Sequence, residues 1–262
     1  MRDDVSLEND LREAVTKGKL QVAYQPLVEL DSGRIAGMEA LVRWNHPLRG
    51  PVPPVEFIPV AEAVGLIGVI GEQVLRAACA QFAAIQASDP GGTLRSVSVN
   101  LSRAQLREPT LVGVIADALR CNGMQAAQLQ LEITESLAAQ DHGVQARLRE
   151  IKALGVTLAL DDFGTGYSSL SCLHELPIDT VKIDRAFVSL AQTSDYHRVL
   201  IEATILVART LRMNTVAEGI ETIGQAELMR ALGCTKGQGY LFSAPLSGAA
   251  LVEWMQGNTA PG

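Results

Sequence analysis

Short apolar runs alternate with longer segments of helical periodicity along most of the chain. In the longer segments, apolar residues recur three and four positions apart, as expected for a helix that packs one face on a sheet. The apolar runs between them are short enough to be buried strands. We expect strands at residues 21–26, 37–44, 97–101, 129–134, 157–161, 180–184, 214–218 and 237–242.

Several helical segments show one apolar face. The predicted faces are Val74, Ala78, Phe82 and Ile85; Val144, Leu148 and Ile151; and Val199, Ala203, Leu206 and Thr210. Two helix starts carry the Ser/Thr-x-x-Gln pattern of a capping box, one from Ser102 to Gln105 and the other from Thr222 to Gln225. A further helix is expected at residues 7–17.

Eight strands that alternate with helices predict an α/β protein, and we expect a TIM-type (β/α)8 barrel. A doubly wound open sheet has the same alternation and stays possible on the pattern alone. No linker or low-complexity segment interrupts the chain, so we expect a single domain over residues 1–262, with its core at about 7–256. The proline-rich stretch 47–59 is interpreted as an ordered loop.

Ionisable and amide residues fall within or at the end of most of the predicted strands. Burying a lone charge costs several kcal/mol, so one such residue could be an ion-paired exception but a repeated pattern indicates a site. In a barrel these positions converge on the carboxyl-terminal face of the strands, where barrel enzymes keep their active sites. The residues are Glu39, Asn100, Glu132, Asp161, Asp162, Lys182 and Glu218.

These side chains carry more negative charge than the neighbouring cations, Lys182 and Arg43, can neutralise. The excess predicts divalent cations, and ligands that are all oxygen atoms favour Mg2+ or Mn2+ over zinc. The four histidines form no HxxxH pair, which argues against a zinc hydrolase. Adjacent Asp161 and Asp162 suit a pair of bridged ions, an arrangement typical of phosphoryl transfer. The glycine-rich residues 163–169 are interpreted as a mobile loop beside these ions.

Composition narrows the function classes. The chain has 262 residues, is 47% hydrophobic and carries a formal net charge of -7 without a basic run, which argues against binding a nucleic-acid polymer or a membrane surface. No apolar stretch is long enough to cross a bilayer, and no signal region opens the sequence. The four scattered cysteines form no CxxC pair, so we expect reduced thiols and a cytoplasmic domain, although its parent protein could be membrane-anchored.

The order and spacing of the motifs resemble those of the EAL family of cyclic-di-GMP phosphodiesterases. Three residues alone, Glu39-Ala40-Leu41, would be a weak match, but similar blocks extend over roughly residues 11–255. These blocks are Tyr24-Gln25-Pro26, Val42-Arg43-Trp44, Glu56-Phe57-Ile58-Pro59, Val99-Asn100-Leu101-Ser102, Leu131-Glu132-Ile133-Thr134-Glu135, residues 161–170, Val181-Lys182-Ile183-Asp184, Ala217-Glu218-Gly219-Ile220-Glu221 and Gln238-Gly239-Tyr240.

The resemblance implies a barrel whose first strand is antiparallel to the rest, and a metal-dependent hydrolysis of cyclic di-GMP to linear pGpG. The metal ligands it implies are Glu39, Asn100, Glu132, Asp161, Asp162 and Glu218, which would hold two Mg2+ or Mn2+ ions. The catalytic residues it implies are Glu39, Lys182 and Glu218, with Glu218 either a ligand or a general base. The residues it implies for the dinucleotide are Gln25, Leu41, Arg43, Asp184, Glu221 and Gln238. Glu135 would anchor the loop after the paired aspartates, near the family's homodimer contact.

Several alternatives stay open at this point. The chain could be a catalytically silent receptor for the same dinucleotide, or an enolase-like barrel that combines Mg2+ with a lysine base. Asp184 could cap the helix that follows it, Asn100 could cap the helix at Ser102, and Lys182 could be a structural counter-charge. The resemblance also implies a possible upstream sensory or GGDEF domain in the parent protein.

Overall fold

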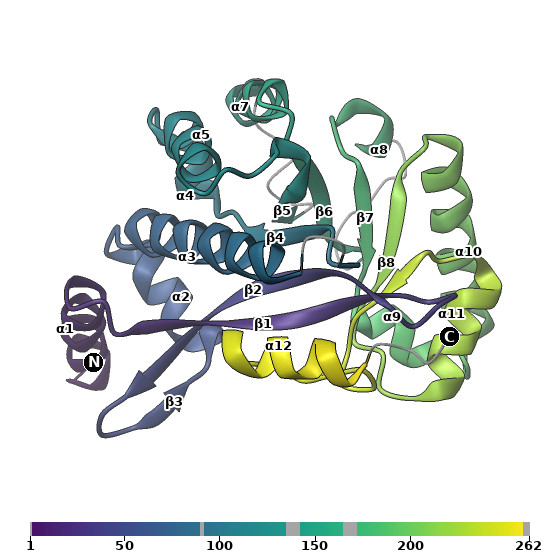
Figure 1. Cartoon of the computed structure of the whole chain (residues 1–262), viewed down its shortest axis with the longest axis horizontal. Coiled ribbons are helices and arrows are strands. Elements are labelled where there is room, and N and C mark those ends of the chain that lie inside the picture. The colour runs from purple at the N-terminus through teal and green to yellow at the C-terminus, as the bar shows by residue number, and fades with distance from the viewer. Residues whose placement is uncertain (1, 90–91, 135–141, 165–171, 259–262) are drawn as a thin grey trace.

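The sheet closes on itself into a barrel that helices surround (Figure 1). In this computed structural model, the described residues are 2–89, 92–134, 142–164 and 172–258. Eight strands form the ring, and a short ninth strand, β3 (Gly50–Val52), extends β2 outside it. The ring strands are β1 (Leu20–Glu29), β2 (Ile35–His46), β4 (Ser96–Asn100), β5 (Leu129–Thr134), β6 (Thr157–Phe163), β7 (Thr180–Ile183), β8 (Asn214–Ala217) and β9 (Lys236–Gly237).

The direction of β1 confirms the expected departure from an all-parallel barrel. Strands β2 and β4 to β9 are parallel to their neighbours around the ring, whereas β1 is antiparallel to both β2 and β9. The β1–β2 pairing is the longest and runs from Leu20 opposite Trp44 to Val28 opposite Ile35. A tight hairpin at Gly33, whose φ of +67° suits glycine, joins the two strands.

Helices cover the outside of the ring, and α3 lies against β4 and β2 while α12 lies along β1 (Figure 1). Helix α3 buries a long apolar stripe, and α12 buries Leu251 with partly buried residues beside it, which is the packing that stabilises a two-layer barrel. The helices are α1 (Arg2–Thr16), α2 (Pro54–Ala63), α3 (Ile67–Ser88), α4 (Arg103–Arg107), α5 (Leu111–Cys121), α7 (His142–Ala153), α8 (Cys172–Glu175), α9 (Arg185–Leu190), α10 (Asp195–Thr210), α11 (Ile223–Leu232) and α12 (Gly248–Gly257), with a 3-10 turn at Ala126–Gln128.

Two of the three predicted helix faces are confirmed, and the third is wrong. The predicted faces of α3 and α7 are fully buried, whereas Val199 and Leu206 on α10 are 58% and 62% exposed. The face that α10 does bury consists of Ile201, Thr204, Ile205 and Ala208. This face is hard to recognise in the sequence because polar Thr204 interrupts its apolar pattern. Thr204 is tolerated there because its hydroxyl donates to the carbonyl oxygen of Leu200 at 2.8 Å.

Other local expectations have mixed outcomes. Both capping boxes are present, at Ser102 on α4 and at Thr222 on α11. The proline-rich stretch is not a loop throughout, because residues 50–52 form β3 and Pro54 occupies the first turn of α2, where a proline has no hydrogen bond to lose. The last strand is shorter than predicted: beyond Gly237 the chain turns away, with the Phe242 N–H donating to the carbonyl oxygen of Gly239.

No helix within the described residues is both long enough and apolar enough to span a bilayer.

Candidate active site

The parallel strands bring their carboxyl ends, and the polar residues there, to one end of the barrel. Asn100 is the last residue of β4, Asp161 and Asp162 lie near the end of β6, and Glu218 directly follows β8. Glu39, Glu132 and Lys182 come from the interiors of β2, β5 and β7 and are 7%, 2% and 2% exposed. The seven residues predicted from the strand pattern therefore meet in one place.

Lys182 lies at the centre of this cluster. Its ammonium contacts carboxylates from four other strands or strand ends, so it bridges most of the barrel. The distances from its Nζ are 2.5 Å to Glu132 Oε2, 2.7 Å to Glu218 Oε1, 3.2 Å to Asp161 Oδ1 and 3.5 Å to Glu39 Oε2. Burial alone would lower the pKa of Lys182, but these carboxylates raise it well above its usual value, so the lysine is charged.

Two neutral amides orient the carboxylate of Glu39. Asn100 Nδ2 donates to Oε1 at 2.9 Å, and Gln238 Nε2 donates to Oε2 at 2.7 Å. Burial alone would raise the pKa of Glu39, but the Lys182 charge and the two donated hydrogen bonds lower it below the usual value. Glu39 is thus held ionised and in one orientation. Asn100 does not cap the helix that follows, because Ser102 is the N-cap of α4.

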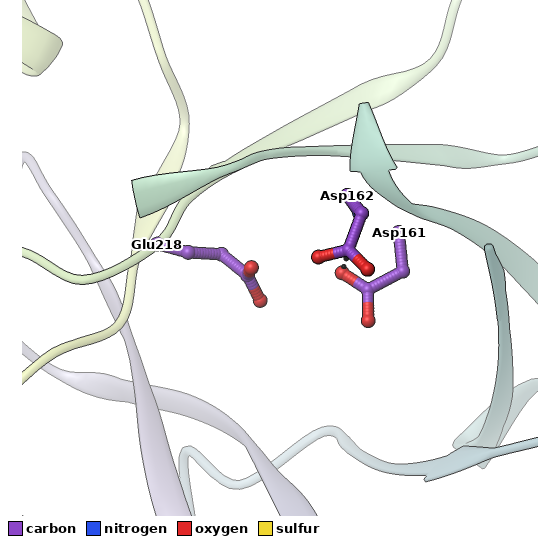
Figure 2. Close-up of side chains that lie close together, drawn as sticks. All are labelled: Asp161, Asp162 and Glu218. Carbon is purple, nitrogen blue, oxygen red and sulfur yellow. Dashed lines mark hydrogen bonds between the residues drawn. The ribbon is translucent and has the colours of Figure 1, made fainter. Parts of the chain in front are cut away.

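A bulge in β6 turns two consecutive aspartates toward the same site. Successive side chains of a regular strand point to opposite faces, so adjacent residues cannot normally share a ligand. Between Leu160 and Phe163 the register with β7 shifts by one residue, and Asp162 adopts a φ of +54°. Figure 2 shows the Asp161 and Asp162 carboxylates together and that of Glu218 pointing toward them.

The donor set fits a hard divalent cation. Oxygen atoms of Asp161, Asp162 and Glu218 all lie within 4.8 Å of one another, near enough for one ion to draw them together. Burial raises the pKa of Glu218 to about 8, and it also raises that of Asp162, with help from the Asp161 charge. Both shifts reflect burial together with neighbouring negative charge, and Lys182 alone does not offset them. Bound Mg2+ or Mn2+ would offset that charge, since these ions prefer carboxylate and amide oxygens.

A cavity of about 340 Å³ opens over the acidic cluster. Five of the six residues predicted to contact a dinucleotide line it: Gln25, Leu41, Asp184, Glu221 and Gln238. Gln238 Nε2 donates to both Glu39 Oε2 and Gln25 Oε1, so it links the predicted binding residues to the acidic cluster. The cavity and the cluster form one continuous site.

Four other predictions have separate outcomes. Arg43 does not line the cavity, and its Nη1 donates to the carbonyl oxygen of Val42. Burial lowers the pKa of Arg43, and the nearby Tyr240 and Glu39 partly offset that lowering. Asp184 both lines the cavity and caps α9, where its Oδ1 accepts from the Ala186 N–H at 2.8 Å. Glu135 and residues 165–169 of the glycine-rich loop lie outside the described residues.

Sequence reasoning missed four residues that line the cavity, namely Arg185, Gly219, Gly239 and Tyr240. Arg185 adds a positive charge to the rim, and Tyr240 is 70% exposed there. The signal for three of them was available, since Gly219, Gly239 and Tyr240 stand inside motif blocks that also contain predicted residues. Arg185 directly follows such a block, but a charged residue at a helix start is too common to single out.

A family model described as the EAL domain matches residues 8–245. The chain belongs to the EAL domain family. The barrel with one antiparallel strand also agrees with a solved member: the PaMucR phosphodiesterase in complex with c-di-GMP superposes with a TM-score of 0.88 at 39% identity, over 94% of this chain and 99% of that one. The EAL enzyme Bd1971, with cAMP and cyclic di-GMP bound, gives a TM-score of 0.91 at 30% identity, over 97% of this chain and 69% of that one.

Curated relatives of this EAL domain include the cyclic di-GMP phosphodiesterase NbdA of Pseudomonas aeruginosa. The two are 39% identical over 254 residues, which is 97% of this chain and 32% of NbdA. An uncharacterized signaling protein of Caulobacter vibrioides is 43% identical over 97% of this chain and 31% of its own length. The chain thus spans about a third of the length of these curated relatives.

Proposed function

We propose that this EAL domain hydrolyses cyclic di-GMP to linear pGpG, with Mg2+ or Mn2+ bound at the acidic cluster. The observation that carries the proposal is the complete set of Glu39, Asn100, Glu132, the paired aspartates, Lys182 and Glu218 beneath one cavity. Solved and curated relatives that are named as cyclic-di-GMP phosphodiesterases support the substrate class.

The residues divide the work of phosphodiester hydrolysis. Bound divalent ions would supply an activated water molecule and positive charge for the phosphate. Gln25, Asp184 and Gln238 present amide and carboxylate groups to the dinucleotide from the cavity wall. Lys182 holds a fixed positive charge directly beneath the metal-binding oxygens, where it would offset negative charge that develops on the phosphate, and such preorganised charge is a large contribution to catalysis.

Proton transfer falls to Glu218 in one form of this proposal. The oxygen of water forms a bond to phosphorus, the bond from phosphorus to the leaving ribose oxygen breaks, and that oxygen gains a proton from the surroundings. The carboxylate of Glu218, which lies beside the paired aspartates, accepts the proton that the water loses. In the other form Glu218 is a metal ligand, and solvent takes the proton.

Incubation with cyclic di-GMP and Mn2+, followed by chromatography, tests the activity. We expect pGpG from the wild type and none from Glu39→Ala, since that variant removes a carboxylate that three other side chains contact. Glu202→Ala removes an exposed carboxylate on α10 and serves as the matched control. A wild type that binds the dinucleotide with Mn2+ yet releases no pGpG would instead be a receptor.

An enolase-like reaction has no specific observation in its favour. Its lysine base would need to lose its proton, whereas four carboxylates hold Lys182 in the charged form. The structural counter-charge reading of Lys182 is compatible with the proposal, because the same ammonium can stabilise the cluster and the reacting phosphate.

The wider setting of the domain stays a prediction. We expect a homodimer, a role for Glu135 in anchoring the neighbouring loop, a cytoplasmic location and an upstream sensory or GGDEF domain. Relatives such as MucR, a bifunctional diguanylate cyclase/cyclic di-GMP phosphodiesterase, are longer than this chain, which covers 36% of that protein.

A further inference from the structure

A row of three polar side chains, two of them buried and the middle one half-buried, crosses the barrel one level below the acidic cluster. Ser98, Gln130 and Thr180 each precede a site residue by two positions, on β4, β5 and β7. Because side chains two apart on a strand share a face, the row lies on the barrel side that carries Asn100 and its partners. The interior of a barrel of this type is usually filled by bulky branched apolar residues, so a row of polar side chains there indicates a specific role.

Hydrogen bonds join the three side chains into one unit. The Ser98 hydroxyl donates to Gln130 Oε1 at 3.2 Å, and Gln130 Nε2 donates to the Thr180 hydroxyl oxygen at 2.9 Å. Ser98 and Thr180 are only 4% and 3% exposed. Buried polar groups are costly unless bonded, and here each supplies the partner that another needs.

The row repeats the geometry of the ion pair above it. Gln130 and Thr180 join β5 to β7, as Glu132 and Lys182 do two residues further along the same strands. Both contacts pass over the intervening strand β6. Between the two strands, β6 contributes Ala159, which pairs in register with Thr180 on one side and with Glu132 on the other, and its small side chain leaves room for the glutamine to reach across.

We propose that Ser98, Gln130 and Thr180 are positioning residues that fix the spacing of β5 and β7, and thereby the placement of the Glu132 carboxylate and Lys182 ammonium relative to the metal-binding oxygens. The inference rests on the proposed function, since it assigns the row a role in that site. Stability alone does not call for the row, because apolar side chains of the same shape replace a buried hydrogen-bonded pair with little loss.

The chemistry explains why such spacing matters. Lys182 contacts carboxylates from four places on the ring, so a lateral shift of β7 changes all of these distances together. Misplacement of catalytic groups by about 1 Å can lower a rate roughly 100-fold. Supporting hydrogen bonds beneath a site are the usual means of preventing that shift.

A pair of threonine variants tests the proposal. Thr180→Val keeps the shape but loses the hydroxyl, whereas Thr180→Ser keeps the hydroxyl. We expect Thr180→Val to lower kcat for cyclic di-GMP and the Mn2+ affinity measured by calorimetry, each about 10-fold, with KM unchanged, because the altered groups hold ions and phosphate rather than the bases. Thr180→Ser should restore both values, and Gln130→Met should behave like Thr180→Val.

The matched control is Thr215→Val on β8. Thr215 is also 3% exposed, but its side chain bonds to Thr235 and not to the row. This variant should lower the melting temperature without changing the Mn2+ affinity or the kcat of the remaining folded protein.

Several results would overturn the inference. A Thr180→Val variant that binds Mn2+ as tightly as the wild type would do so. Equal losses of Mn2+ affinity and kcat in Thr180→Val and Thr215→Val would do so too, because they would then follow only from lower stability. The Mn2+ measurement separates this inference from the proposed function. A wild type that binds Mn2+ but makes no pGpG refutes the activity, while weaker Mn2+ binding by Thr180→Val still supports the positioning role.

Discussion

Metal binding at this site should depend steeply on pH because of Glu218. Burial raises the pKa of this carboxyl from 4.5 to about 8 in the metal-free protein, so the group is mostly protonated at pH 7. A carboxyl must lose its proton to bind a metal ion, so binding must release that proton. The affinity for Mn2+ should therefore rise with pH until Glu218 is ionised.

The magnitude follows from the pKa. The fraction of ionised carboxyl with a pKa of about 8 grows about 50-fold from pH 6 to pH 8, and the apparent Mn2+ affinity should grow by the same factor. At pH 7, binding should release about 0.9 protons from this group. Calorimetric titrations in two buffers with different ionisation enthalpies measure both quantities.

Two variants complete this experiment. Glu218→Gln cannot ionise, so it should bind Mn2+ more weakly and lose this contribution to the pH dependence. Glu202→Gln changes an exposed carboxyl on α10 and should retain the wild-type slope. A wild-type affinity that varies less than twofold between pH 6 and pH 8, with no proton released, would refute the reasoning.

Three further predictions concern stability. Because the pKa of Glu218 is raised on folding, the folded protein binds more protons at this group than the unfolded chain does between about pH 4.5 and pH 8. The melting temperature of the metal-free wild type should therefore fall as pH rises through this range, and Glu218→Gln should lack this contribution. Asp162→Val should have a free energy of unfolding about 1–2 kcal/mol lower than that of Asp162→Asn in urea titrations, because a branched residue is strained at a φ of +54° and asparagine is not. Equal free energies of unfolding would contradict this. Gly239→Ala should cost more than about 2 kcal/mol in a urea titration, since the new Cβ would lie 2.1 Å from the Ile220 carbonyl oxygen, and a smaller loss would show that this backbone can move.

The sequence predicted the strands well where burial alone decides them. The strand at residues 129–134 has the predicted bounds, because apolar Leu129, Leu131 and Ile133 alternate with polar residues over its whole length, a pattern of period two that is typical of a strand. The strand predicted at 237–242 was mostly wrong, since Tyr240 and Leu241 look strand-like by composition. The close approach of Gly239 to the Ile220 backbone, which turns the chain there, is a tertiary contact that no local pattern reports.

The candidate site was predictable for a different reason. A charge in an apolar strand is unfavourable by itself, so repeated charges near strand ends indicate that something compensates them. That argument identified Glu132 and Lys182 without any geometry. It could not find the bulge at Asp162 or the row formed by Ser98, Gln130 and Thr180, because small polar residues in strands are unremarkable until their partners are known.

The reversed first strand also decides which end of the barrel each terminal helix joins. Because β1 begins opposite Trp44, beyond Glu39 on β2, helix α1 joins the barrel on the carboxyl-terminal side of β2, and the contact of Asp10 with His46 holds it there. Helix α12 ends beside Arg34 and Ile35, at the opposite end of the barrel. A module fused ahead of α1 would therefore act on β1, and through the Asp10–His46 contact on β2, the strand that carries Glu39, whereas one fused behind α12 would act on the far end. For building a ligand-controlled version of this domain, the amino terminus is the better place of attachment.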